Sequence, residues 1–105
     1  MNAINTRYAT AADLDAAAAL FDGYRQFYQQ PSDLALARRF LTERFERKES
    51  VLIVAEDDMG TLIGFTQLYP TFCSVRAAHT FVLYDLFVTP AARGTGAGRA
   101  LMLAA

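Results

Sequence analysis

Apolar residues recur every three or four positions in two stretches of the first half of the chain, which is the period of an amphipathic helix. The first predicted helix covers about residues 11–29, and Thr10 and Asp13 form a Thr-x-x-Asp capping box at its start. The second covers about residues 33–48 and turns its charged residues outward. Pro31 interrupts the pattern between them, so two helices are predicted rather than one.

Shorter apolar runs elsewhere in the chain have the composition or the alternation of β-strands. Residues 4–8 alternate as in an edge strand, and residues 51–55 form a run rich in β-branched side chains. The turn residues 57–60 separate that run from a further extended segment, residues 61–69, so these two strands are predicted to form a hairpin. Residues 79–88 are predicted to be the last strand.

The most informative segment is the glycine-rich sequence that connects this last strand to a run of helix formers, residues 99–105. Glycines lack a Cβ atom, so successive backbone N–H groups can point into one concavity, and the positive end of the helix dipole adds to them. The segment therefore predicts a phosphate or pyrophosphate site. The residues that would form this site are Arg93, Gly94, Thr95, Gly96, Ala97 and Gly98.

Two common phosphate-binding loops do not match this spacing. A dinucleotide-binding loop has its third glycine where this chain has Arg99, and a P-loop closes with Gly-Lys-Ser/Thr. An ordinary glycine-rich turn between a strand and a helix, with no ligand, stays open as the structural alternative.

The segment resembles the acetyl-CoA signature of the GNAT superfamily of N-acetyltransferases, which is Arg/Gln-x-x-Gly-x-Gly/Ala after a strand that ends in Val-x-Pro. Arg93, Gly96 and Gly98 match the three defining positions, and Val88 and Pro90 match the strand end. The resemblance implies an α/β fold with a mixed, mostly antiparallel sheet flanked by helices, in the order strand, helix, helix, strand, strand, strand, helix. It also implies that residues 1–105 are the N-terminal two thirds of a single N-acetyltransferase domain, without its C-terminal strands and helix.

The activity that the resemblance implies is transfer of an acetyl group from acetyl-CoA to a primary amine of a small molecule, by direct attack on the thioester. Backbone groups of Phe87 and Val88 would then bind the pantetheine arm, and the glycine loop would bind the pyrophosphate. Tyr24 and Tyr28, with Phe27 between them, would border the acceptor pocket. The alternative for these aromatic residues is ordinary core packing. In the family the general acid comes from the region after residue 105.

Asp85 is the candidate catalytic residue, because a carboxylate inside an apolar strand is costly without a partner or a role. It could remove the proton of the amine, directly or through a water molecule, or anchor a cationic substrate. A structural aspartate that is hydrogen-bonded to backbone or to a tyrosine is the alternative. His79 and Cys73 are weaker candidates for a base and a nucleophile, since the sequence places no partner beside either.

Composition and charge narrow the classes of function further. With 105 residues, 53% of them hydrophobic, the chain is predicted to form one small globular domain. A net charge of -1 without a basic stripe argues against nucleic acid as a partner, and the lack of a long apolar stretch argues against a membrane. One cysteine and one histidine predict no disulfide and no metal site, as in a cytoplasmic protein.

Two functions of other classes stay open on these residues. The chain could be a non-catalytic acyl-CoA-binding or regulatory fragment, or an assembly protein in which the glycine loop is only a turn. The last predicted strand would have an open apolar edge, and a homodimer is the assembly that such an edge favours.

Overall fold

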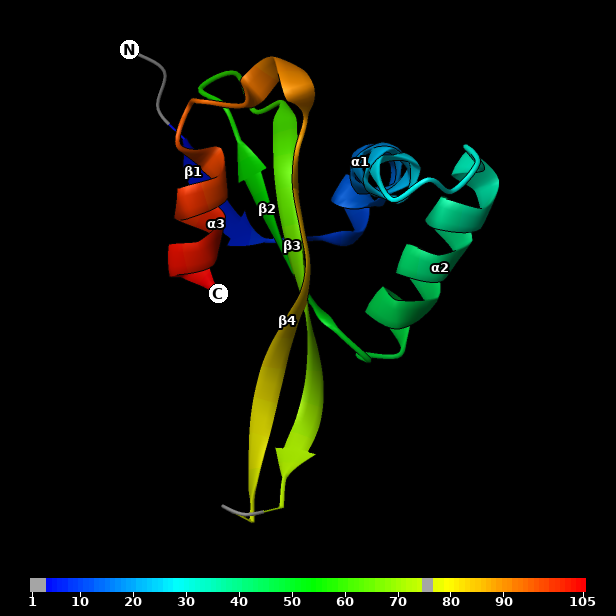
Figure 1. The fold of residues 1–105 in the computed structure, drawn as a ribbon, viewed down its shortest axis with the longest axis vertical. Coiled ribbons are helices and arrows are strands. Elements are labelled where there is room, and N and C mark those ends of the chain that lie inside the picture. The colour runs from blue at the N-terminus through cyan, green and yellow to red at the C-terminus, as the bar shows by residue number, and fades with distance from the viewer. Residues whose placement is uncertain (1–3, 75–76) are drawn as a thin grey trace.

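The predicted order of strands and helices is confirmed by the structure, a computed structural model that describes residues 4–74 and 77–105 (Figure 1). The elements in chain order are β1 (Asn5–Tyr8), the 3-10 helix η1 (Ala11–Asp13), α1 (Leu14–Phe27), α2 (Leu34–Glu46), β2 (Val51–Glu56), β3 (Leu62–Cys73), β4 (Ala78–Val88), the 3-10 helix η2 (Pro90–Ala92) and α3 (Ala97–Ala104). The two 3-10 turns are too short for a periodic pattern to separate from the elements around them. Among the described residues, no helix is both long enough and apolar enough to cross a membrane.

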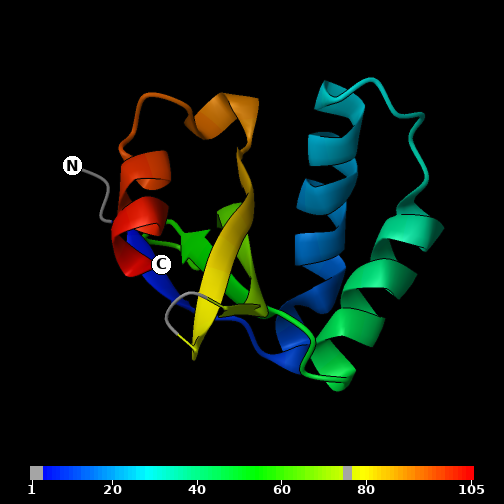
Figure 2. The ribbon, with the colours of Figure 1, turned by 60° about the horizontal axis from the view of Figure 1, so that its bottom comes forward.

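The four strands form one sheet in the order β1-β2-β3-β4, and every neighbouring pair is antiparallel. Helices α1 and α2 cover one face of the sheet and α3 lies on the other, as Figure 2 shows. The expected hairpin of β2 and β3 is present, and β1 is an edge strand as predicted. Strand β4 forms the opposite edge of the described sheet.

Strand β2 is buried on both faces, which explains why its sequence is a continuous apolar run rather than an alternating one. Leu52 and Val54 pack into the core under α1 and α2, while Ile53 and Ala55 pack into the core under α3. The two cores lie back to back across the sheet, so helices support its centre from both sides.

Strands β3 and β4 are longer than the other two and continue past them as a two-stranded hairpin (Figure 1). Strand β2 begins at Val51, which pairs with Leu68, so the part of β3 after Leu68 has a neighbouring strand on one side only, within the described residues. Pro70 lies in this part, where a strand with one neighbour tolerates a residue without an N–H. The predicted strand end at residue 69 is therefore wrong, and the strand runs on to Cys73.

The pairing register of β3 and β4 shifts after Gln67, which pairs directly with Asp85. Tyr84 is the extra residue on β4, as in a β-bulge. Asp85 lies two residues before Phe87, whose ring packs against the core under α1 and α2, so both side chains face these helices.

Candidate functional site

The end of β4 presents its backbone hydrogen-bonding groups to two different sides. Phe87 pairs with Phe65, and a further ladder bond runs from Thr89 N to Ile63 O at 2.8 Å. Hydrogen-bonded positions alternate along an antiparallel strand, so the N–H and C=O groups of Phe87 face β3 while those of Val88 face the open edge.

Contacts at Gly64 and Arg93 support these directions of the Phe87 and Val88 backbone groups. A Cβ atom on Gly64 would lie 2.8 Å from Phe87 O, so a larger residue at position 64 would push β3 and β4 apart. On the open edge, Arg93 donates a hydrogen bond from Nε to Val88 O at 3.1 Å. The carbonyl of Val88 is therefore within reach of groups that approach from outside the sheet.

The loop after β4 has left-handed backbone at two of its glycines. Gly94 has a φ of 86° and Gly96 a φ of 90°, and a Cβ atom on either residue would meet no atom within 4 Å. These glycines are therefore required for the backbone conformation and not for space. Thr95 donates a hydrogen bond from its hydroxyl to Ala92 O at 2.6 Å, which ties the loop to η2.

Helix α3 begins directly after this loop, with Gly96 as its N-cap. Its first hydrogen bond runs from Ala100 N to Gly96 O at 3.0 Å, so the amides of residues 97–99 have no partner within the helix. They lie at the positive end of the helix dipole, beside the glycine loop. This backbone fits an anion such as the diphosphate of a coenzyme.

A pocket of about 200 Å³ lies where α1, the end of β4 and the loop meet. Its lining residues are Tyr24, Phe27, Tyr28, Leu86, Phe87, Val88 and Arg93. The guanidinium of Arg93 is 5.6 Å from the centre of the Phe87 ring and 5.8 Å from that of Phe27, so a cation stacks on aromatic rings at this pocket. The structure thus brings the aromatic residues of α1 together with the strand end and the loop.

Asp85 lies behind this pocket and is not part of its lining. It is 8% exposed, and its Oδ2 accepts a hydrogen bond from Gln67 Nε2 at 2.9 Å. Burial raises the pKa of the Tyr24 phenol above its ordinary value, and interaction with the Asp85 carboxylate raises it further. Tyr24, which lines the pocket, is therefore close enough to Asp85 to feel its charge.

Comparisons with known proteins agree with this geometry. The acetyltransferase (GNAT) family model matches residues 15–105. An uncharacterized N-acetyltransferase of Bacillus subtilis (strain 168), YhfO, is 52% identical over 102 residues, which are 97% of this chain and 68% of that protein. The chain belongs to the GNAT family of acetyltransferases.

Solved structures show the same GNAT fold. The crystal structure of a probable acetyltransferase has a TM-score of 0.90 and 38% identity, over 95% of this chain and 67% of that one. A predicted acetyltransferase from Clostridium acetobutylicum, solved with acetyl-CoA, has a TM-score of 0.73 over 97% of this chain and 70% of that one, and its 14% identity makes this a likeness of fold alone. This GNAT chain spans about two thirds of the length of these relatives.

Tyr24 serves both the core and the pocket of this GNAT chain. Its ring packs edge-on against Phe65 and Phe87, with centroids 5.8 and 6.3 Å apart, and it also lines the pocket. Tyr28 is 59% exposed and lies 5.1 Å from the Tyr24 ring. Tyr24 therefore packs in the core and also lines the pocket, although the sequence leaves these two positions as alternatives.

The other nucleophile and base candidates lie away from this pocket or outside the described residues. The His79 ring is on the outer part of the β3–β4 hairpin, 4.4 Å from the Phe72 ring. Cys73 ends β3, and its side chain lies outside the described residues. Within residues 4–74 and 77–105, no three His, Cys, Asp or Glu side chains come close enough together to hold a metal ion.

Two residues at or behind the candidate site were missed by reasoning from the sequence. Leu86 lines the pocket, and Gln67 is the fully buried partner of Asp85. A glutamine inside an apolar strand is a signal in the sequence, since a buried amide needs hydrogen-bonding partners. The identity of its partner depends on the strand register, which the sequence does not show.

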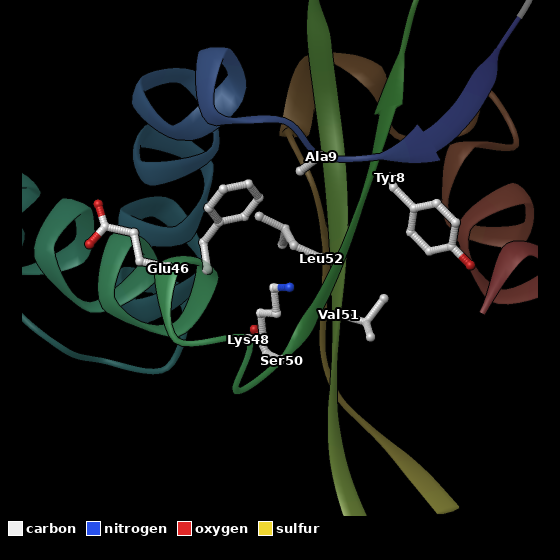
Figure 3. Close-up of a pocket in the computed structure, with 8 residues that line it drawn as sticks. Tyr8, Ala9, Glu46, Lys48, Ser50, Val51 and Leu52 are labelled. Atoms are coloured by element: carbon white, nitrogen blue, oxygen red, sulfur yellow. The ribbon is translucent and has the colours of Figure 1, made fainter.

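A larger pocket, of about 670 Å³, opens between the end of α2 and the start of β2 (Figure 3). It is lined mainly by apolar side chains; Lys48 extends into it, whereas the carboxylate of Glu46 points away. None of the residues predicted for the GNAT site borders it. The smaller pocket at the glycine loop is therefore the candidate active site.

Proposed function

We propose that this protein is an N-acetyltransferase that transfers the acetyl group of acetyl-CoA to a primary amine of a small molecule. The observation that carries the proposal is that the open strand edge at Val88 continues directly into the glycine loop, around one aromatic pocket. A solved neighbour of the same fold that carries acetyl-CoA supports this choice of acyl donor.

The chain offers coenzyme A two kinds of contact. The outward N–H and C=O groups of Val88 would pair with the pantetheine arm as a further strand would, while the Phe87 ring forms the wall behind it. The amides between Arg93 and Gly98, together with the first turn of α3, would hold the diphosphate. The Arg93 side chain adds a positive charge at the same place.

The residues of the pocket also suit the acceptor. An amine attacks a carbonyl carbon only after it has lost its extra proton, since an ammonium has no lone pair. Asp85 is the proposed acceptor of that proton, by way of Tyr24 or a water molecule. When bound, acetyl-CoA would supply the thioester: its C–S bond would break as the new C–N bond forms, and coenzyme A would leave as a thiolate that takes up the second proton lost by the nitrogen. The rings of Tyr24 and Tyr28 in the same pocket suit the cationic form of the amine before it loses its proton.

The test combines thermal protection by coenzyme A with thiol release from acetyl-CoA in the presence of a panel of small amines. The wild-type protein should show a higher Tm with coenzyme A and amine-dependent thiol release. Gly96→Val should lose both, because a β-branched residue is strained at a φ of 90°. Gly60→Val is the matched control, since Gly60 has a φ of 80° and equally open surroundings, in the turn between β2 and β3.

The possible outcomes separate the enzyme from the other two functions. Protection by coenzyme A without thiol release for any amine would favour a binding module. No protection of the wild-type protein would contradict the proposal and leave the loop as a turn. Equal losses in Gly96→Val and Gly60→Val would trace the effect to general instability and would also count against the proposal.

A further inference from the structure

We propose that Gln67 is the positioning residue for Asp85, and that its side-chain amide holds the Asp85 carboxylate in the orientation and charge state of a base. This inference rests on the proposed function, because that function gives Asp85 its role as proton acceptor. Gln67 itself lies inside the protein and does not border the pocket.

Gln67 and Asp85 face each other across β3 and β4. They are direct cross-strand partners, Gln67 is 0% exposed, and Asp85 is 8% exposed. Gln67 Nε2 donates to Asp85 Oδ2 at 2.9 Å and to Tyr69 Oη at 3.0 Å. Both N–H donors of the amide therefore have partners inside the protein.

This amide is also anchored from its other side. Ser50 donates a hydrogen bond from its hydroxyl to Gln67 Oε1 at 2.9 Å. Rotation of the amide by half a turn would bring Oε1 against the Asp85 carboxylate and would place two acceptors face to face. The carboxylate, which only accepts, therefore keeps the donor side of Gln67 towards itself, and the bond from Ser50 to Oε1 holds the amide in place.

The same hydrogen bonds select a charge state. An ionised carboxylate only accepts hydrogen bonds, whereas a protonated one also has to donate. The amide nitrogen of Gln67 cannot accept, so the bond to Oδ2 stabilises the ionised form of Asp85. Burial acts in the opposite direction, because it disfavours a charge. The hydrogen bond from Gln67 thus acts against the energetic cost of burying the charge of Asp85.

Few other titratable groups face this carboxylate from the elements packed around it. Tyr24 comes from α1 and Tyr69 from β3, and burial raises the pKa of Tyr69 to about 12 and that of Tyr24 further above its ordinary value. Arg44 of α2 and Tyr84 of β4 also influence the pKa of Tyr69. The phenols and the guanidinium keep their protons in acid, so none of them changes charge there.

The experiment replaces Gln67 by leucine and follows the carboxyl carbon of Asp85 by NMR as the pH is changed. In Gln67→Leu the carboxylate loses its donor, and the titration midpoint should rise by about one pH unit, a tenfold change in proton affinity. The acidic limb of the kcat/KM profile for acetyl transfer should move by the same amount. A purely structural glutamine would lower stability without moving either midpoint.

Thr66→Val is the matched control. Thr66 is also 0% exposed and lies next to Gln67, but its hydroxyl donates to the backbone O of Asp85 at 2.8 Å and not to the carboxylate. This variant should lower stability and leave the midpoint in place. Should Gln67→Leu fail to fold, Ser50→Ala, which removes the hydrogen bond that anchors Oε1, is expected to raise the midpoint by a smaller amount.

An unchanged midpoint in both Gln67→Leu and Ser50→Ala would overturn the inference, and so would an equal shift in Thr66→Val. The NMR titration needs no turnover. Absence of acetyl transfer by the wild-type protein would therefore contradict the proposed function. The NMR titration midpoints of the variants decide separately whether Gln67 controls the Asp85 carboxylate.

Discussion

Two glycines, Gly64 and Gly23, determine where Phe87 can lie, one at its backbone and one at its ring. A Cβ atom on Gly64 of β3 would lie 2.8 Å from Phe87 O, and a Cβ atom on Gly23 of α1 would lie 3.3 Å from the Phe87 ring. The first contact involves backbone that is fixed in the sheet, whereas the second involves a side chain that can rotate. The same added methyl group should therefore have different effects at the two positions.

Gly64→Ala should lower the free energy of unfolding by about 1–3 kcal/mol, because β4 has to move away from β3 at its functional end. It should also reduce the thermal protection given by coenzyme A. Gly23→Ala should change stability by less than about 1 kcal/mol, since a better helix former offsets the tight contact with the ring. Urea unfolding with and without coenzyme A checks both expectations. Equal losses in the two variants would contradict the assignment of the Phe87 backbone to β3.

Arg7 and Asp13 form the centre of an ion-pair cluster that joins three segments of the chain. Oδ2 accepts hydrogen bonds from Thr10 N and from Arg7 Nη1, both at 2.7 Å, and the contact with Thr10 confirms the predicted capping interaction. Arg7 also donates from Nη2 to Glu56 Oε2 at 3.3 Å. The ion pairs thus tie β1 both to η1 and to the end of β2.

This cluster makes stability depend on pH in a defined direction. The hydrogen bonds from Arg7 hold the pKa of Asp13 well below its ordinary value, against the effect of burial. The stabilisation is therefore complete above the unfolded pKa of about 3.9 and is lost as the pH falls towards the lower folded pKa. We expect Asp13→Asn to cost about 2 kcal/mol at pH 7, a difference that narrows in urea unfolding below about pH 4. The control Asp15→Asn, at an exposed ion pair with Arg38, should change the free energy of unfolding little. A stability loss in Asp13→Asn that is the same at all pH values would contradict this pH dependence.

Both long helices end in the same way, at a residue with left-handed backbone that is not glycine. In α2, Glu49 N bonds to Arg44 O at 2.9 Å and Lys48 N to Phe45 O at 3.2 Å, which is the Schellman pattern. Lys48 takes the left-handed position with a φ of 53°, as Gln29 does after α1 with a φ of 69°. Glycine is the residue that adopts this conformation without a steric penalty.

Lys48→Gly should therefore stabilise the protein by up to about 1 kcal/mol, as measured by chemical or thermal unfolding. Lys48→Ala separates conformation from charge, since alanine removes the ammonium but keeps the strain of a Cβ atom. A gain for glycine alone supports strain at the helix end. A similar gain for both variants would instead point to the charge of Lys48.

These helix ends also show how far the sequence specifies the elements. The order of elements follows from apolar periodicity and turn residues. Each helix buries one face against the sheet, and each strand buries one or both of its faces under the helices. The ends at Phe27 and Glu46 lie two residues before the predicted ones. Neither end has the glycine that usually marks a helix end in the sequence. Gln29 and Lys48 adopt the left-handed backbone conformation in its place. A helix end at which a residue other than glycine takes the left-handed conformation cannot be recognised from the residue type.

At the scale of the whole molecule, the candidate site lies where segments that are distant in sequence come together. The glycine loop could be predicted because it is local: strand end, turn and helix start follow one another along the chain. The partner of Asp85 could not, because the pairing with Gln67 depends on the register of β3 and β4 and on the bulge at Tyr84. Long-range register is set by the packing of whole strands, so it has no short sequence signature.

Stability should also be distributed unevenly over the molecule. Strand β2 has neighbours on both sides and helices on both faces, and Val54 and Ala55 are 0% exposed. The outer part of the β3–β4 hairpin has two strands, with Phe72 and Phe81 70% and 53% exposed. Two-stranded ribbons are only marginally stable on their own, so this part should open without the rest of the fold.

Native-state hydrogen exchange tests this expectation and links it to the site. The amides of Val54 and Ala55 should exchange only through global unfolding, more than about 100-fold more slowly than the amide of Thr71 in the outer hairpin. Coenzyme A should slow exchange at Val88 and in the first turn of α3, where the free amides acquire partners, and should leave Thr71 unchanged. Uniform protection across both regions would contradict the local opening of the hairpin. Slowing of all amides in equal proportion would show that the ligand stabilises the fold without contacting the loop, so the pattern of protection, rather than its size, locates the binding surface.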